Sequence, residues 1–362
     1  MSKTAVSPTV QTSQEAMFER IWELKRAFGR ELIILGHHYQ RDEVLQFADF
    51  VGDSFKLSQQ AAQVEEAKYI LFAGVHFMAE SAAVLNPPGR AVLLPNPQAG
   101  CAMAEMGRDA RVMRVWEELI AALGDPQMVM PVTYMNSTAA LKAFVGRQGG
   151  AVCTSSNAET VLRWAWQRRP KVFFFPDQHL GRNVAKRLGV ALEEMVVWNP
   201  ARPLGGLSPE EIQRARFILW KGHCPVHMQF LPEHVAQWRQ QVPDIRIMVH
   251  PECKMEVVDQ ADLVGSTEFI VRQVRQAPPG TQWAIGTEVN LVRRLQKQHP
   301  EQEIHLLTPY PAQCVNMVRN RPEDVLTVLE ALQRGEVLHW ATVPEETAHW
   351  ARVALERMLA LK

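Results

Sequence analysis

Three cysteines stand at matching places in this sequence of 362 residues. Cys101, Cys224 and Cys314 each close a segment that begins with a pair of polar side chains and continues through a short serine-containing turn. A threefold arrangement of such segments would bring three thiolates to one axis. Three soft sulfur ligands suit a [4Fe–4S] cluster that keeps one iron open, and an open iron can act as a Lewis acid on a hydroxyl or carboxylate.

Two other interpretations of these cysteines stay open at the level of sequence. Free cysteines are commonly small buried hydrophobic residues, and this is what we expect of Cys153 and Cys253, which have no common place in the segments. Zinc is the competing metal, because Cys224 and His227 have a plausible half-site spacing, although no second half is apparent nearby. The chain has no CxxC pair, which argues against a zinc ribbon or thioredoxin motif.

Polar pairs with i, i+2 spacing end the first expected strand of each segment. Residues two apart on a strand point to the same face, so the pairs predict one central cavity lined by polar groups. Histidine and a partly buried glutamate can exchange protons near neutral pH, and tyrosine can donate or relay a proton. The six side chains are His37, Tyr39, Tyr134, Asn136, His250 and Glu252.

A serine in a polar turn precedes a helix in each segment, at Ser54, Ser155 and Ser266. Hydroxyls and backbone N–H groups at helix starts hold anions such as carboxylate or phosphate, and Thr267 extends the third turn. The alternative is that these serines only cap their helices, which is the commoner role of such residues.

Short apolar runs alternate with helical stretches along the whole chain. This order predicts an α/β fold with parallel sheets, in which ligands bind beyond the carboxyl ends of the strands. Three similar segments predict three similar parallel-sheet α/β/α units. The expected strands are 31–36, 69–75, 90–95, 128–134, 171–176, 217–220, 245–250, 283–287 and 301–307.

The repeat also sets the expected domain boundaries. The chain advances 64 residues from His37 to Cys101 and from His250 to Cys314, but 90 from Tyr134 to Cys224, which predicts an insert at 195–216. We expect a disordered tail over 1–14 and units over 15–107, 108–228 and 229–319. Residues 320–362 are expected to form two helices that pack on the core.

Composition excludes several classes of protein. Lys+Arg and Asp+Glu both number 39, which argues against binding nucleic acid or a membrane through a large basic surface. No run approaches the ~18 apolar residues of a spanning helix, and the N-terminal segment lacks the apolar core of a signal peptide. We therefore expect a cytoplasmic protein with five unpaired thiols or metal ligands. The sequence has no GxGxxG, P-loop, HExxH or GxSxG motif.

Eight phrases in the right order resemble the quinolinate synthase family, from about residue 30 to Arg319. They are HHYQRDEV with ADFVGDS, FAGVHFMAE, TYMNS, CTSSNAE, PDQHLGRN, WKGHCPVH, VHPEC and VGSTEF. The resemblance implies three units around a pseudo-threefold axis and a central iron–sulfur site. That site would hold one [4Fe–4S] cluster per chain, with Cys101, Cys224 and Cys314 as ligands and one iron open. The phrase AQCVNM around Cys314 departs from the family pattern but still supplies a cysteine.

The resemblance also implies an activity, that of a condensing transferase in NAD biosynthesis. Iminoaspartate and dihydroxyacetone phosphate would give quinolinate, phosphate and two waters. The resemblance also implies a transient contact with L-aspartate oxidase, the enzyme that produces iminoaspartate. The implied catalytic residues are Glu252, Tyr39, His37, His250 and Tyr134. The implied substrate-binding residues are His37, Ser54, Tyr134, Asn136, Ser155, His250, Glu252, Ser266 and Thr267.

Two alternative functions share the three-thiolate site. One is another [4Fe–4S] hydro-lyase that acts on a different hydroxy acid, and the other is a non-enzymatic iron–sulfur redox sensor. A sensor needs no cavity lined by six polar side chains, and the sequence contains no obvious output or DNA-binding segment.

Overall fold

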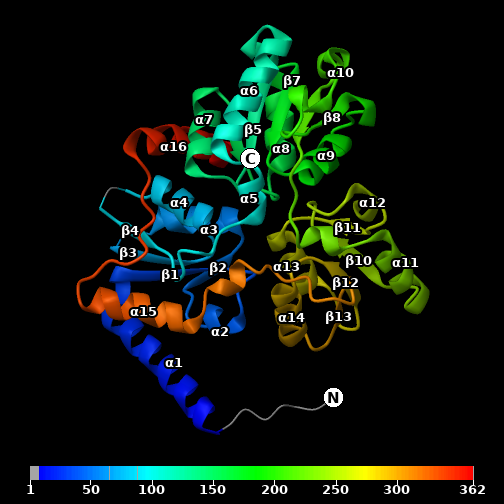
Figure 1. Ribbon diagram of the computed structural model, residues 1–362. Coiled ribbons are helices and arrows are strands. Elements are labelled where there is room, and N and C mark those ends of the chain that lie inside the picture. Colours follow the sequence, from blue (N-terminus) through cyan, green and yellow to red (C-terminus); the bar gives the residue numbers. More distant parts are fainter. Residues whose placement is uncertain (1–7, 65, 88, 362) are drawn as a thin grey trace.

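Three lobes, each built around one parallel sheet, make up the computed structural model, which describes residues 8–64, 66–87 and 89–361 (Figure 1). Every strand pairing within the described sheets is parallel. The structure therefore confirms the predicted α/β class with three similar parallel-sheet units.

The first and third sheets have the same strand order, and the second adds one edge strand to it. The first sheet runs β2 (Phe50–Gly52), β1 (Leu32–His37), β3 (Tyr69–Ala73), β4 (Ala91–Leu93). The second runs β6 (Ala151–Cys153), β5 (Val129–Tyr134), β7 (Lys171–Phe175), β9 (Phe217–Trp220), β8 (Met195–Trp198). The third runs β11 (Leu263–Val264), β10 (Arg246–Val249), β12 (Gln282–Gly286), β13 (Glu303–Leu306).

Helices pack around each sheet. The first lobe has α1 (Pro8–Phe28), α2 (Asp42–Leu45), α3 (Ser54–Gln63), α4 (His76–Leu85) and α5 (Ala102–Met106). The second has α6 (Asp109–Leu123), α7 (Ala139–Arg147), α8 (Ala158–Arg168), α9 (Gln178–Arg187) and α10 (Pro209–Arg214). The third has α11 (Pro232–Gln241), α12 (Met255–Val258), α13 (Thr267–Gln276) and α14 (Val289–Gln298).

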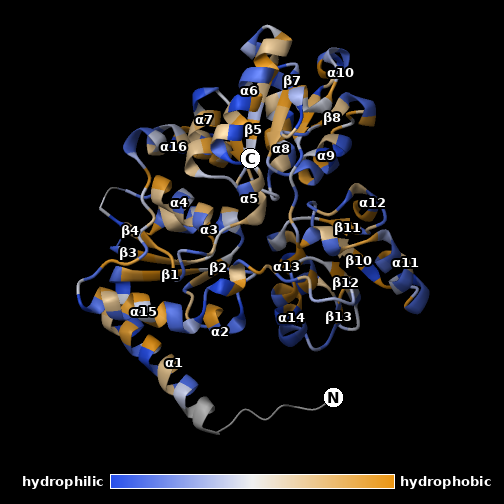
Figure 2. Cartoon of the chain, viewed as in Figure 1, coloured by the Kyte–Doolittle hydropathy of each residue, from blue (hydrophilic) through white to orange (hydrophobic). Residues whose placement is uncertain are grey.

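The central strands are buried and mostly apolar because helices cover both of their faces. Every residue of β5, β7 and β9 is buried. Figure 2 shows the same arrangement, with hydrophobic strands inside the lobes and hydrophilic residues on the outer faces of the helices. No helix in the described part of the chain is both long enough and apolar enough to cross a membrane.

All nine predicted strands are present, and four short strands were missed. The expected insert, 195–216, contains the edge strand β8, the 3₁₀ turn Pro203–Gly206 and α10, so the extra chain widens the second sheet. The other missed strands, β2, β6 and β11, are only two or three residues long.

The N-terminal tail prediction needs a correction. Residues 1–7 lie outside the described part of the chain, but α1 begins at Pro8, so residues 8–14 are helical. Proline suits the first turn of a helix because its fixed φ and missing N–H are compatible with that position.

The last two helices pack on different units. α15 (Pro322–Gln333) lies against α1, and its residues Val325, Val328 and Leu329 join the core beneath the first sheet. α16 (Glu345–Ala360) lies against α7 of the second unit (Figure 1). The chain end thus links the first unit to the second.

Equivalent strands carry equivalent chemistry in the three units. The polar pairs end or follow β1, β5 and β10, the serine turns follow β2, β6 and β11, and the cysteines follow β4, β9 and β13. Since all strands of a parallel sheet end at the same edge, each unit presents its three sets of side chains together.

Candidate active site

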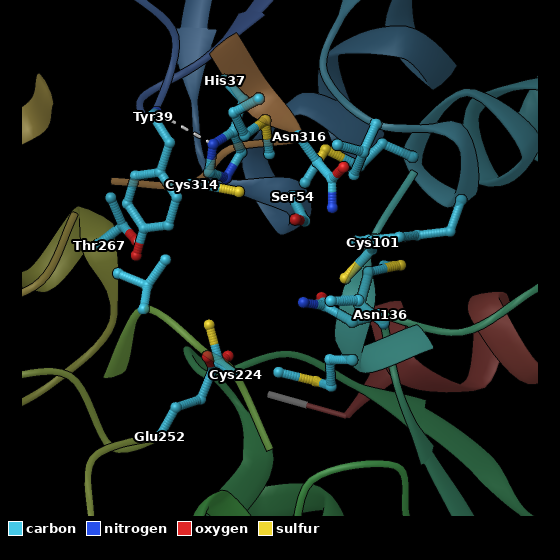
Figure 3. Close-up of a pocket in the computed structure, with 18 of the residues that line it drawn as sticks. His37, Tyr39, Ser54, Cys101, Asn136, Cys224, Glu252, Thr267, Cys314 and Asn316 are labelled. Atoms are coloured by element: carbon cyan, nitrogen blue, oxygen red, sulfur yellow. Dashed lines mark hydrogen bonds between the residues drawn. The ribbon is translucent and has the colours of Figure 1, made fainter. Parts of the chain in front are cut away.

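A single cavity collects side chains from all three units (Figure 3). The empty space in it, its open mouth included, is about 1050 Å³. Of the predicted site residues, Ser266 alone is not part of its lining. Those that line it are His37, Tyr39, Ser54, Cys101, Tyr134, Asn136, Ser155, Cys224, His250, Glu252, Thr267 and Cys314.

The sulfur atoms of Cys101, Cys224 and Cys314 point into the cavity from three sides (Figure 3). None of the three forms a disulfide. Burial raises the pKa of all three thiols, that of Cys101 to about 12. By contrast, Cys153 and Cys253 are fully buried and do not line the cavity.

This donor set fits an iron–sulfur cluster. Apolar side chains surround the cysteines, among them Met78, Met103, Met135 and Met317. An apolar wall limits the access of water, and three sulfur donors leave one coordination position for a substrate. The cavity is therefore suited in both polarity and ligand type to a cluster with one open iron.

Glu252 lines the cavity, with only 3% of its surface exposed. The Tyr134 hydroxyl donates to its Oε1 at 2.6 Å, and His227 Nδ1 lies 2.8 Å from its Oε2. Burial raises the pKa of this carboxyl, but His250, His227 and the hydrogen bond from Tyr134 outweigh that effect and lower it. Glu252 is thus held as a carboxylate that can accept a proton.

His37 and His250 make the same hydrogen bond in two different units. The Nδ1 atom of His37 accepts from the Tyr39 N–H at 3.1 Å, and that of His250 accepts from the Glu252 N–H at 3.3 Å. This assignment places the ring hydrogen on Nε2 in both residues. Burial lowers the pKa of both to about 3, so they are neutral hydrogen-bond donors at neutral pH.

The sequence model of the quinolinate synthetase A protein family matches residues 19–360 of this chain. The chain belongs to this family. Its three cysteines, its polar pairs and its helix starts all lie within the matched range.

Curated relatives of the family are similar over almost the full chain. A quinolinate synthase from a Nocardioides strain is 51% identical over 356 residues, covering 96% of this chain and 90% of the relative. The quinolinate synthase of Corynebacterium glutamicum is 50% identical, with 97% and 89% covered. That of Geobacillus kaustophilus is 50% identical, with 93% and 91% covered.

Two polar residues that the sequence did not assign to catalysis connect the catalytic candidates of this family member. Thr287 Oγ1 lies 2.9 Å from the Tyr39 hydroxyl and 3.4 Å from His227 Nε2. Together with the bonds of Glu252, these contacts form a buried chain from Tyr39 to Tyr134. Thr287 directly follows β12. A polar residue at the carboxyl end of a strand is the sequence pattern from which its place in the site could have been predicted.

The third unit holds the turn that carries Tyr39. Arg294 on α14 donates to Asp42 Oδ1 at 2.8 Å, to the His38 carbonyl at 2.9 Å and to the Gln40 carbonyl at 2.6 Å. These bonds fix the first-unit turn against the third unit. Arg294 is therefore a positioning residue for the Tyr39 side of the cavity.

Two buried acids order the loops around the cavity. Asp177 caps α9 by accepting from the backbone N–H groups of His179 and Leu180. Glu288 caps α14 and also accepts from the Cys314 N–H at 3.2 Å, while burial raises its pKa to about 7. Glu288 thereby positions a cysteine of the cavity.

The serine turns divide into two roles. Ser54 and Thr267 are the first residues of α3 and α13 and line the cavity. Ser266 instead caps α13 through a bond from the Phe269 N–H, and the Ser156 hydroxyl lies 2.9 Å from its own. Since Ser156 also donates to Asp53 Oδ2 at 3.0 Å, this cluster joins all three units.

We expect Ser266→Ala to lower stability more than substrate binding. The change removes a helix cap and a bond between units, and loss of a serine cap typically costs about 1 kcal/mol. Denaturant unfolding measures the first effect and KM the second, with Ser54→Ala as the control that alters a lining hydroxyl. Unchanged stability combined with a raised KM would show that Ser266 contacts substrate.

Proposed function

We propose that this protein is a quinolinate synthase. It would condense iminoaspartate with dihydroxyacetone phosphate to give quinolinate, phosphate and two waters in de novo NAD synthesis. The observation that carries the proposal is the convergence of Cys101, Cys224 and Cys314 with the Glu252–Tyr134 pair in one cavity. Relatives about 50% identical over nearly the whole chain bear this enzyme's name.

We further propose that Cys101, Cys224 and Cys314 hold one [4Fe–4S] cluster. When bound, the cluster would supply a Lewis-acidic open iron that assists the loss of a substrate hydroxyl as water. The three cysteines come from three different units and all line the same cavity, which supports this proposal.

The polar end of the cavity supplies groups that can bind the two substrates. Ser54 and Thr267 offer hydroxyls at the N-termini of α3 and α13, where backbone N–H groups also favour carboxylate and phosphate. Asn136 lines the same cavity, and the neutral His37 and His250 rings can donate to substrate oxygens. These contacts would orient iminoaspartate against the triose.

Proton transfer would centre on Glu252. Its carboxylate can take a proton from a substrate carbon next to a carbonyl or imine. Tyr134 and Tyr39 can donate, because burial raises the pKa of both phenols and keeps them protonated. Thr287 and His227 connect Tyr39 to Glu252. A proton that Glu252 removes from one substrate atom can therefore be delivered to another substrate atom through Tyr39.

We place the reaction in the cytoplasm, whose reducing conditions preserve thiols. L-aspartate oxidase, by a transient contact, would be the source of iminoaspartate. The family comparisons do not favour the alternative functions, a different hydro-lyase or a redox sensor.

An anaerobic assay tests the proposed activity. Protein reconstituted with iron and sulfide should form quinolinate and phosphate in equal amounts from dihydroxyacetone phosphate and iminoaspartate generated in situ. Mass spectrometry measures the first product and a colorimetric assay the second. Cluster-loaded protein that forms no quinolinate, but dehydrates another hydroxy acid, would favour the hydro-lyase.

A further inference from the structure

A second set of metal-binding groups overlaps the cavity. The sulfur of Cys224, a ring nitrogen of His227 and a carboxylate oxygen of Glu252 all lie within 4.8 Å of one another. His227 and Glu252 are almost completely buried. Thiolate, imidazole and carboxylate are the three ligand types that zinc takes in proteins.

The separation of these atoms is close to that in a zinc site. Zinc bonds of about 2.0–2.3 Å in tetrahedral geometry place neighbouring ligand atoms about 3.2–3.8 Å apart. His227 Nδ1 and Glu252 Oε2 are already 2.8 Å apart, so small side-chain rotations would admit an ion. A fourth ligand position would face the cavity, which Cys224 and Glu252 both line.

The ligands come from two different units. Cys224 and His227 follow β9 in the second sheet, with the spacing of a zinc half-site, whereas Glu252 follows β10 in the third sheet. The third ligand is therefore distant in sequence and is brought to the other two only by the packing of the units. Cys101 and Cys314 do not belong to this group.

We propose that the cluster-free protein binds one Zn²⁺ through Cys224, His227 and Glu252. We infer that this zinc form and the cluster form exclude each other, which rests on the proposed function because Cys224 would serve both metals. Binding forms three metal–ligand bonds and releases the thiol proton of Cys224, while His227 binds as a neutral imidazole and Glu252 as a carboxylate. No oxidation or reduction takes place.

Two consequences follow for the zinc form. It lacks a free Cys224 for cluster assembly, and its Glu252 carboxylate is no longer available as a base. Zinc supplied before iron and sulfide should therefore lower the cluster content in proportion to the zinc bound.

Cobalt titration of the full chain tests the site. Protein purified anaerobically and freed of metal by a chelator should bind one Co²⁺, with a thiolate-to-cobalt absorption band and the intense visible bands of tetrahedral cobalt. Zn²⁺ should displace it. Cys224→Ser and His227→Gln should each weaken binding by more than about tenfold, because even partners outside the ligand shell contribute about 10–100-fold to metal affinity.

The matched controls separate this site from the proposed cluster. Cys101→Ser and Cys314→Ser should lose the cluster yet bind Co²⁺ as the wild type does. Equal loss of Co²⁺ in these two variants, or full binding in Cys224→Ser, would overturn the proposal. The melting temperature shows whether His227→Gln is folded. If this variant is unfolded, Cys224→Ser alone tests the metal site. Quinolinate formation by cluster-loaded wild type tests the proposed activity independently.

Discussion

Serine in place of Cys101, Cys224 or Cys314 should remove most of the iron and sulfide from the reconstituted protein. The wild type should hold about four irons and four sulfides per chain. Each of these cysteines supplies one of the three thiol groups that line the cavity, and a serine hydroxyl is a hard, weakly acidic donor that soft metal centres bind poorly. Iron and sulfide analysis with absorption spectroscopy under anaerobic conditions measures the loss.

Cys153→Ser and Cys253→Ser are the matched controls for this prediction. Both cysteines are fully buried and lie outside the cavity lining, so their variants should keep the cluster. A buried hydroxyl without a partner costs about 1–3 kcal/mol, so the melting temperature of Cys153→Ser should fall while its iron content per folded chain stays constant. Cys253 Sγ faces the Gly286 carbonyl at 3.7 Å, a partner that a serine hydroxyl could keep. A full cluster in all three ligand variants, or no bound iron and sulfide in wild-type protein reconstituted in the absence of zinc, would contradict the assignment.

The central strands could be predicted from sequence because burial on both faces demands long apolar runs. β5 and β7 are such runs, and every residue in them is buried. The edge strands β2, β6 and β11 could not be predicted, since two or three residues show no periodicity. They are strands because a longer neighbour offers backbone hydrogen bonds, which is a property of the folded sheet.

The residues that line the cavity could be predicted where polar side chains stand at the ends of equivalent strands in the three segments. This rule predicts that His37, Tyr134 and Glu252 share one site, and all three line the cavity. It could not find the contact of Thr287 with Tyr39, or the approach of Glu252 to Cys224, because each is a specific contact between side chains of two different units. Such pairs are set by how whole units pack.

Ser266 shows the limit of residue type as a guide. A serine at a helix start offers the same hydroxyl whether it binds an anion or caps the helix. In this structure Ser266 caps α13, and the next residue, Thr267, faces the cavity. A shift of one residue at the start of a helix decides the role, and sequence spacing does not resolve it.

We expect Glu252→Gln to lower turnover by about 10²–10⁴-fold, the usual contribution of a positioned acid or base. The amide has the size and reach of the carboxylate but cannot accept a proton from substrate. It also cannot keep both oxygen contacts, with the Tyr134 hydroxyl and with the His227 ring. Quinolinate formation, iron content and melting temperature should be measured on the same preparations.

Tyr134→Phe and Tyr39→Phe complete this test of the proton-handling chain. Each removes one hydroxyl and little volume, so each should lower turnover while cluster content stays near that of the wild type. Glu117→Gln, on the exposed side of α6, and Tyr69→Phe are the controls, because both side chains lie outside the cavity lining and should leave turnover unchanged. Lost stability with normal specific activity in the folded fraction would assign Glu252 a structural role. Wild-type turnover in Glu252→Gln, Tyr134→Phe and Tyr39→Phe would place the active site elsewhere. These substitutions remove the acid–base groups and leave the shape of the cavity almost unchanged.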